Sequence, residues 1–493
     1  MALVPLQIQA GIYRNGTDLQ SQGRWRDANL IRWTDGTMGP VGGWRVKSAT
    51  ATANKIRGML AWKENSGTRR IAAGTYNKLY TYSQTGVRSD ITPAGLTAGR
   101  EDADINTGYG AGAYGDSYYG TERADNSTIL EATTWSLDSW GEYLVACNAD
   151  DGRIYEWTLN TATPAAVVTN APTGNKAILV TEERFLFALG ASGNPRLIKW
   201  CDKENNTSWT PAATNEAGDI ELQTAGEIMC GVRVRGQALI LTTIDAHVMS
   251  YLGPPYVYSR ERVGTSCGVI SRRAAAVTDL GAVWMGMKAF YSYSGGAVAK
   301  VPSEVSDYVF SDINQSQITK VYATTNARFS EVWWFYPSGG SVENDRYVVW
   351  NYAENTWSIG SLARTAAVDH GAFRYPLWAS AEDNHIYEHE FGFDYGALTP
   401  FAESGPVMLA TGDQVASVVQ MLPDEKTQGD VSATFKTRFY PNGEEREYGP
   451  YVMSNPVSLR FTGRQLRIRV EGERLANWRV GINRLDIVSG GRR

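Results

Sequence analysis

Short apolar strands recur along most of the chain, and this recurrence limits the fold more than any other feature. Between about residues 50 and 396, each unit has an apolar strand, a turn, a second apolar strand and a short strand ending in aromatic residues. Periods of roughly 40–50 residues built from short strands are typical of propeller blades or stacked arrays. About seven units, unevenly spaced, contain the segments 56–82, 141–157, 177–200, 238–251, 281–293, 331–351 and 376–388.

None of these units is large enough to bury its own faces, so they must pack on one another. Radial closure into a ring buries all of them at once. The 50 glycines and the aromatic content of 11% suit a chain rich in strands and turns. The sequence therefore predicts an all-β fold, a β-propeller of about seven blades over residues 51–398. Six or eight blades also fit, and an open array of β-meanders is the alternative.

One long insertion interrupts the repeats. Residues 94–132 contain the Gly/Tyr-rich stretch 107–120, which is low in aliphatic side chains. Such a stretch cannot form a packed strand, so we predict a long exposed loop.

A short helix is predicted near residues 303–318. Ser303 is the expected N-cap, and Val305, Val309 and Ile313 follow at a spacing of four residues. This apolar stripe should pack on the propeller.

The pattern of apolar and polar residues changes near residue 399. Segments 431–440 and 465–470 alternate apolar and polar residues, which is typical of a half-buried antiparallel sheet. We predict a small β-sandwich-like domain over residues 399–493. Residues 1–50 are expected to form an extended arm that closes or docks on the propeller.

Charge separates the two predicted bodies. Residues 431–493 hold 12 Lys/Arg and 6 Asp/Glu, whereas the whole chain carries a net charge of −5. An acidic propeller followed by a basic domain is the result. A net acidic chain does not coat nucleic acid through general electrostatic attraction.

The spacing of cysteines and histidines gives little indication of a metal site. The cysteines lie 54, 29 and 37 residues apart, so no CxxC pair begins a zinc site, and we expect reduced, buried thiols. His385 and His389 have the spacing of helical zinc ligands, but the residues between them resemble a strand. We predict no metal. The cysteines are Cys147, Cys201, Cys230 and Cys267.

Three loop motifs only partly match binding sites. The G-x-G-x-x-G at residues 110–115 lacks the preceding strand and following helix of a dinucleotide site. Residues 102–113 end on Ala113 where a calcium loop requires Glu. Residues 148–155 partly match the Asp box of sialidases, which is itself a blade turn. The chain has neither a nucleophile elbow nor a P-loop, so we predict no enzyme and no cofactor.

The sequence also gives an expectation about location. The N-terminus lacks the basic start and apolar stretch of a secretory signal, and no run of 18 apolar residues occurs. We expect a chain made in the cytoplasm that does not span a membrane.

An ordered set of motifs opens and closes the chain. Gly11-Ile, Gly23-Arg-Trp and Gly42-Gly43-Trp44 follow one another in the first 44 residues, and the chain ends with 478–486 and a terminal Gly-Gly-Arg-Arg. Together with the Gly/Tyr stretch, this order resembles the tail nozzle proteins of tailed bacteriophages, also called packaged-DNA stabilisation proteins. The resemblance spans most of the chain.

The resemblance implies a structural role in the virion. It implies a β-propeller body and a homo-oligomeric ring, commonly a hexamer, that extends the portal and adaptor channel into a short tail. Double-stranded DNA would pass through the lumen without sequence-specific binding, and tail fibres or a plug or needle protein would be further partners. The protein would be located in the phage tail and assembled in the bacterial cytoplasm.

Two groups of residues are candidates for subunit or partner contacts. Arg and Trp are enriched at interfaces, and the arm is too polar to form a core alone; the alternative is that the arm supplies a blade's outer strand. Tyrosines of the Gly/Tyr stretch suit binding loops, although a disordered linker fits equally well. The candidates are Arg24, Trp25, Arg26, Arg32, Trp33, Trp44, Tyr109, Tyr114, Tyr118 and Tyr119.

A second functional class stays open. A host-glycan-binding or glycan-cleaving tail protein with a propeller fold could stack sugars on an aromatic face. Such proteins are usually trimeric and peripheral, whereas a nozzle is an axial ring.

Overall fold

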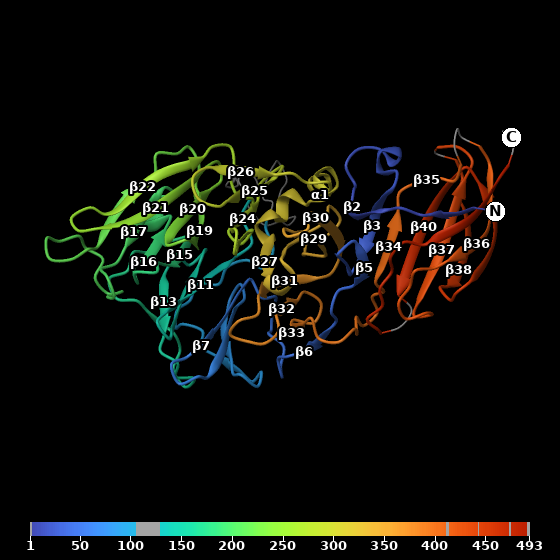
Figure 1. The fold of residues 1–493 in the computed structure, drawn as a ribbon. Helices are drawn as coiled ribbons and strands as arrows, with labels where there is room; N and C mark the ends of the chain where they lie inside the picture. Colours follow the sequence, from blue (N-terminus) through green and yellow to red (C-terminus); the bar gives the residue numbers. More distant parts are fainter. Residues whose placement is uncertain (1, 105–128, 411–413, 442, 473–474, 491–493) are drawn as a thin grey trace, which may run out of the picture.

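The structure is a computed structural model that describes residues 2–104, 129–410, 414–441, 443–472 and 475–490. The molecule is elongated, with a ring of sheets at one end and a smaller body, which carries both chain ends, at the other (Figure 1). Within the described residues, no helix is long and apolar enough to cross a membrane.

The ring consists of four-stranded antiparallel sheets, seven of them in the described residues. The first sheet contains β7 (Gly58–Lys63), β8 (Arg69–Gly74), β9 (Leu79–Tyr82) and β10 (Arg88–Asp90). The second contains β11 (Trp135–Trp140), β12 (Tyr143–Asn148), β13 (Ile154–Trp157) and β14 (Ala166–Val167). The third contains β15 (Ala177–Val180), β16 (Leu186–Leu189), β17 (Leu197–Trp200) and β18 (Gly218–Glu221). The fourth contains β19 (Ile228–Val234), β20 (Gln237–Thr242), β21 (Ala246–Gly253) and β22 (Val257–Gly264). The fifth contains β23 (Ala275–Thr278), β24 (Gly281–Met285), β25 (Phe290–Tyr293) and β26 (Val298–Val301). The sixth contains β27 (Tyr322–Asn326), β28 (Glu331–Tyr336), β29 (Arg346–Asn351) and β30 (Thr356–Ser361). The seventh contains β31 (Arg364–Val368), β32 (Leu377–Ser380), β33 (Ile386–His389) and β6 (Trp44–Val46).

The first strands of these sheets form a closed circle. Each first strand, from β7 to β31, packs beside the first strand of the next sheet, and β31 packs beside β7. In the last sheet the fourth strand, β6, comes from the N-terminal part of the chain and pairs antiparallel with β33. This arrangement is that of a β-propeller, as the sequence predicts.

Burial explains why the middle strands are so apolar. All six residues of β28 are buried because the sheet is covered on both faces by its neighbours. At the outer edge, both residues of β14 are exposed.

The repeat pattern finds the middle strands of the sheets better than the first strands. β11 escapes the pattern because polar residues interrupt it. Those residues bind the neighbouring inner strand: the Ser136 hydroxyl donates to the Ile178 carbonyl (3.0 Å), and the Asp138 carboxylate accepts from the Val180 amide (2.9 Å). The polarity thus satisfies backbone groups between two sheets.

The smaller body, which we call the C-terminal module, contains two sheets. Their orders are β1-β41-β36-β39 and β2-β3-β34-β40-β37-β38, with β35 on β40. The C-terminal strands are β34 (Phe401–Ser404), β35 (Val407–Met408), β36 (Ala416–Leu422), β37 (Val431–Arg438), β38 (Arg446–Val452), β39 (Val457–Gly463), β40 (Gln465–Gly472) and β41 (Arg484–Ser489). The two sheets contact each other through the Phe435 ring of β37 and the Phe461 ring of β39, whose centroids lie 5.1 Å apart.

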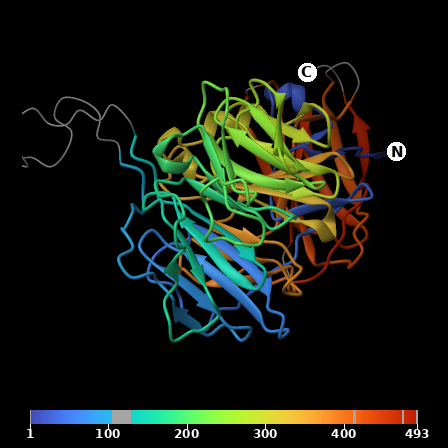
Figure 2. The same ribbon diagram turned by 90° about the vertical axis from the view of Figure 1, so that its left-hand side faces the viewer.

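The N-terminal arm, residues 2–46, connects this module to the ring. Its elements are β1 (Ala2–Pro5), β2 (Gln9–Ile12), the 3-10 turn η1 (Asp18–Ser21), β3 (Arg24–Asn29), the hairpin β4 (Ile31–Thr34) and β5 (Thr37–Pro40), and β6. In Figure 1 the blue strands β2, β3 and β5 lie between the ring and the red module, and Figure 2 shows the ring in front of the module.

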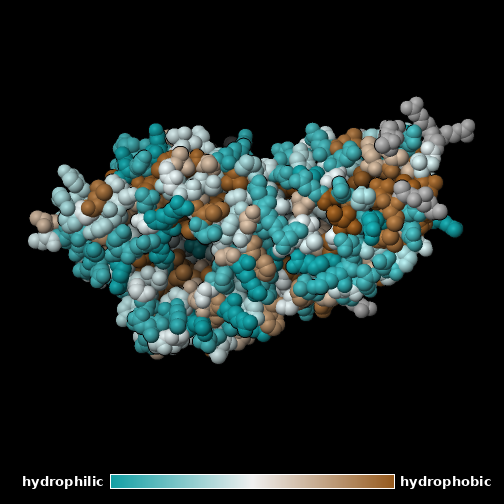
Figure 3. All heavy atoms as spheres, in the orientation of Figure 1, coloured by the Kyte–Doolittle hydropathy of each residue, from teal (hydrophilic) through white to brown (hydrophobic). Residues whose placement is uncertain are grey.

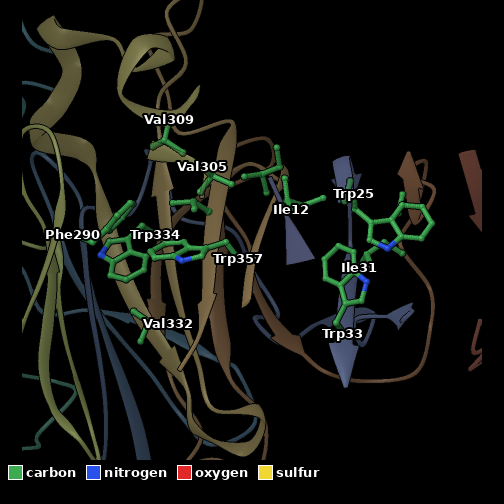
Figure 4. Close-up of a cluster of buried hydrophobic side chains, with 14 of the residues drawn as sticks. Ile12, Trp25, Ile31, Trp33, Phe290, Val305, Val309, Val332, Trp334 and Trp357 are labelled. Carbon is green, nitrogen blue, oxygen red and sulfur yellow. The ribbon is translucent and has the colours of Figure 1, made fainter. Parts of the chain in front are cut away.

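An apolar core runs through the arm from the ring to the module. In Figure 4, Ile12 lies between Val305 and Trp357 on the ring side and Trp25 on the other, and all four side chains are buried in one cluster. The arm therefore fills the space between the two bodies.

The predicted helix is shorter than expected and begins later. α1 spans Ser306–Asp312, with Val305 rather than Ser303 in the N-cap position, and is followed by η3 (Gln315–Lys320). Val305, Val309 and Ile313 are buried, as the spacing predicts. The remaining short turns are η2 (Ala191–Gly193) and η4 (Ala327–Phe329).

Candidate functional site: the N-terminal arm

A buried charge cluster attaches the β4–β5 hairpin to the ring. Arg32 donates to both carboxylate oxygens of Glu331 (2.5 and 2.7 Å) and to Glu390 (2.6 Å), and its side chain is only 8% exposed. The Phe329 ring lies 3.6 Å from its guanidinium carbon. Glu331 begins β28, and Glu390 follows β33, so one arginine ties the arm to two sheets of the ring.

The two carboxylates keep this arginine charged. Burial alone would lower the pKa of Arg32, but Glu331 and Glu390 outweigh burial and raise that pKa above its usual value. Burial would raise the pKa of Glu390, but the charge of Arg32 outweighs it and lowers that pKa. Arg32 and Glu390 are therefore ionised, and each depends on the other.

A second cluster attaches η1 to the C-terminal module. The Asp18 carboxylate accepts from Arg438 of β37 (2.7 Å) and from Arg467 of β40 (2.5 Å), and Arg26 of β3 lies 3.2 Å away. Burial would raise the pKa of Asp18, but its hydrogen bonds to Arg438 and Arg467 lower it below its usual value. This single carboxylate holds three arginines from three strands.

A third contact joins β3 to the segment before α1. Arg24 of β3 is paired with Glu304. Nearby, Arg14 pairs with Asp27 (2.8 Å) and lies over the Tyr308 ring of α1. The arm is therefore bound to the ring by charge as well as by its apolar side chains.

The last arm strand carries Trp44 into the seventh sheet. The Trp44 ring lies 5.2 Å from the buried His389 ring, which stacks on Trp378 at 3.9 Å. Arg364 donates to the Nε2 atom of His389 (3.0 Å). Burial, with the nearby charge of Arg364, holds the pKa of His389 well below its usual value, so this ring is neutral.

These positions correct the role expected for part of the arm. Trp25, Arg32 and Trp33 are buried inside the chain, so they have no free surface to offer another subunit. Their partners are the ring and the module of the same chain. For the partly buried Arg24, Arg26 and Trp44, an additional contact with another subunit stays a prediction.

The acidic partners of these arginines are not evident from the sequence. Glu331 and Glu390 lie hundreds of residues from Arg32, as Asp18 does from Arg438 and Arg467, and no sequence spacing indicates such a contact. A weak signal existed at Glu331, an acid at the start of an otherwise apolar strand.

The remaining sequence candidates add no assembled chemistry. Tyr109, Tyr114, Tyr118 and Tyr119 lie outside the described residues. His385 binds Ser48 while His389 binds Arg364, so these two histidines serve different contacts. In the part of the chain that the structure describes, no group of three or more His, Cys, Asp or Glu side chains could hold a metal ion.

The cysteines and the partial Asp box have local structural roles. All four cysteines are free and buried, as predicted. Asp151, in the turn between β12 and β13, accepts from Arg153 (2.6 Å) and Tyr155 (2.5 Å), which fixes that turn.

The tryptophans face inward. Fourteen of the 16 tryptophans are buried, and Trp44 and Trp350 are partly buried, so none is exposed. A sugar-stacking face would therefore have only these two partly buried tryptophans to use.

Hydrophobic residues do reach the surface of the C-terminal module, as Figure 3 shows. Leu3 and Val4 of β1 and Val488 of β41 are exposed on neighbouring strands of one sheet. These residues give this sheet exposed apolar area.

Comparisons with known proteins show likeness only at the level of architecture. No model of a protein family and no curated protein matches the chain. Solved structures that match include virginiamycin B lyase from Staphylococcus aureus (7% identity, 70% of this chain and 98% of that chain, TM-score 0.42). Others are the β-propeller domain of Cps50 (Swd1) from Myceliophteria thermophila (10%, 70% and 99%, 0.42) and YCF48 from Cyanidioschyzon merolae (9%, 71% and 99%, 0.39). At these values the likeness assigns neither a family nor an activity to the chain.

Proposed function

We propose that this chain is a structural protein of a phage virion, which forms the axial nozzle or hub ring of a short tail. Copies of the chain assemble as a ring, commonly a hexamer, below the adaptor and portal. DNA is retained above the ring and ejected through its lumen. The observation that carries the proposal is the ordered set of arm motifs, Gly11-Ile, Gly23-Arg-Trp and Gly42-Gly43-Trp44, which resembles the opening of tail nozzle proteins.

The finer reading of the fold belongs to this proposal. We interpret the seven ring sheets as seven blades and the two module sheets as a β-sandwich. The basic module of one copy would face an acidic part of its neighbour, with the exposed edge at Leu3, Val4 and Val488 contributing apolar area.

The clusters around the arm support a structural role over a catalytic one. Arg32, Asp18 and Arg24 each end in ion pairs that bind one part of the chain to another. Arg32, Glu331 and Glu390 are buried and paired with one another, whereas a catalytic group must reach a substrate. We therefore propose that the chain is not an enzyme and uses no cofactor.

Mass measurement of the purified protein tests the ring. Mass photometry should find a closed oligomer about six times the chain mass of 54.2 kDa. A monomer or trimer at all concentrations, and in mixtures with purified adaptor complex, would contradict the proposal.

Incubation with host surface polysaccharide tests the alternative. We expect no oligosaccharide release. Release that is abolished by changing one Asp or Glu would favour the glycan-cleaving class.

A further inference from the structure

Two short segments form a stem at the base of the long insertion. These are residues 99–104 and 129–134. Asp104 and Leu130 exchange backbone hydrogen bonds (2.9 and 3.0 Å), and the Arg100 amide donates to the Thr133 hydroxyl (2.7 Å). The stem is therefore a small hydrogen-bonded unit in its own right.

The stem is bound first to the sheets on either side of it in the chain. Arg57, just before β7, donates to the Glu101 carbonyl (2.9 Å). Arg100 donates to Asp150 in the turn between β12 and β13 (3.1 Å). These contacts reach the first and second sheets.

The stem is also bound to the opposite side of the ring. Lys320, just before β27, is paired with Asp102, and the Gln317 side chain makes two hydrogen bonds to the Ala103 backbone (3.0 and 3.2 Å). Arg272, just before β23, is paired with Glu131 (2.5 Å). These contacts reach the fifth and sixth sheets.

All of these anchors lie at one end of the ring. The Trp135 amide at the start of β11 donates to the Arg57 carbonyl, and the Ala323 amide in β27 donates to the carbonyl of Arg273, which precedes β23. The first strands therefore begin at the same end. Since the fifth sheet is three places from the first and from the second around the circle, the stem must cross the ring axis.

Two of the anchored cations, Lys320 and Arg272, have their nearest carboxylate in the stem. The side chains of Lys320, Arg57 and Arg272 are 0%, 2% and 8% exposed. Glu343 of the sixth sheet already binds both terminal nitrogens of Arg57 (2.8 and 2.7 Å) and lies 4.0 Å from Lys320. The nearer acid for Lys320 is Asp102 of the stem, and a buried cation that loses its partner destabilises the fold.

We infer that the stem is a strap that closes the ring across its axis. It is a second closure, in addition to the N-terminal strand β6 that completes the seventh sheet. The stem is thus part of what holds the propeller together. The strap also covers the axis at this end, so a DNA conduit built from this protein lies between copies of the chain. The strap itself does not depend on the proposed function.

Four buried thiols of the ring report whether the strap holds. Cys147, Cys201, Cys230 and Cys267 are free and buried, so a thiol reagent labels them only when the ring opens. In the full-length protein, Asp102→Asn and Glu131→Gln should each raise the native-state labelling rate about tenfold or more. Asp90→Asn, which breaks the exposed Lys78–Asp90 pair (3.0 Å), is the matched control and should change the rate less than about threefold.

A double variant distinguishes the strap from a general loss of stability. Lys320→Met combined with Asp102→Asn removes both charges, so it should label more slowly than Asp102→Asn alone. If Asp102→Asn does not fold and the double variant does, the inference is supported. Labelling of both stem variants at the control rate, or equal labelling of the single and double variants, would overturn it.

Discussion

The ring and the C-terminal module are both antiparallel β structures, yet they are assembled from the chain in opposite ways. Apart from β6, every ring sheet joins strands that follow one another in sequence. The module joins the two ends of the chain: Ala2 of β1 pairs with Ile487 of β41, and β3 pairs with β34. The ring is therefore a local structure, whereas the module needs residues separated by almost the whole chain.

This difference gives the arm its importance. Bringing distant segments together costs loop-closure entropy before any contact is made. The formed ring brings the end of β3 and the start of β34 within reach, because β6 and the β4–β5 hairpin are fixed on it. The module should thus depend on the ring, and the ring much less on the module.

Removing the first arm strands tests this dependence with the largest expected effect. Deletion of residues 2–29 removes β1, β2 and β3 but keeps Arg32 and β6. We expect the module to lose its fold and become protease-sensitive, because both of its sheets lose strands. Limited proteolysis followed by mass spectrometry measures this outcome.

The ring should survive the same deletion. Its four buried thiols should stay protected from labelling. Uniform unfolding of both bodies, or a module that still resists protease, would break the comparison.

Loss of the Arg32 guanidinium should weaken the attachment of the arm to the ring. Arg32→Leu leaves Glu331 and Glu390 buried without their cation, which should lower the free energy of unfolding by about 3–5 kcal/mol. Denaturant unfolding followed by tryptophan fluorescence measures the change.

Arg45 provides the matched control for this arginine. Its side chain is 50% exposed and pairs with Glu388, so Arg45→Ala should cost less than about 1 kcal/mol. Equal effects of the two variants would show that burial of the Arg32 cluster does not matter.

Buried His389 should give the ring a modest pH dependence near neutral pH, whereas residues 399–493 contain no histidine. Its pKa in the folded chain lies well below the usual 6.5, so the unfolded chain takes up a proton that the folded chain does not. Stability from this residue is therefore complete above pH 6.5 and falls as the pH decreases below it.

Replacement of this histidine should remove that contribution. His389→Gln keeps an acceptor for Arg364, and the drop in unfolding midpoint between pH 7.5 and 5.5 should become smaller than in the wild type. His370→Gln changes an exposed histidine and should keep the wild-type drop. An unchanged drop in His389→Gln would contradict the assignment.

The tyrosines of the insertion should affect folding least. Changing Tyr109, Tyr114, Tyr118 and Tyr119 to Ser leaves the stem contacts in place, so thermal unfolding should stay as in the wild type. Under the proposed function, tail assembly, genome retention or infectivity should fall. Unchanged titre and unchanged genome retention would leave only a linker role.

The sequence predicted local structure better than long-range contacts. The apolar repeats gave the middle strands of the ring, because each strand pairs with its neighbour in sequence. Val305, Val309 and Ile313 likewise gave the buried face of α1, although the helix starts later than Ser303 suggests.

The site could not be predicted for the same physical reason. Arg32 and Trp25 looked like interface residues because their composition suits an interface, yet their partners lie in the ring and the module of the same chain. The stem contacts of Asp102 and Glu131 were equally hidden, because Lys320 and Arg272 lie far away in sequence. Composition indicates that a segment is suited to a contact, but only the folded chain shows which residues it contacts.

Electron microscopy of the tails tests the central claim most directly. Virions carrying a gold-labelled tag on this chain should be imaged in negative stain. The proposed nozzle predicts label on the tail axis below the portal, with end views that show a closed ring. Label at the periphery, in separate trimers, or absent from the tail would contradict it.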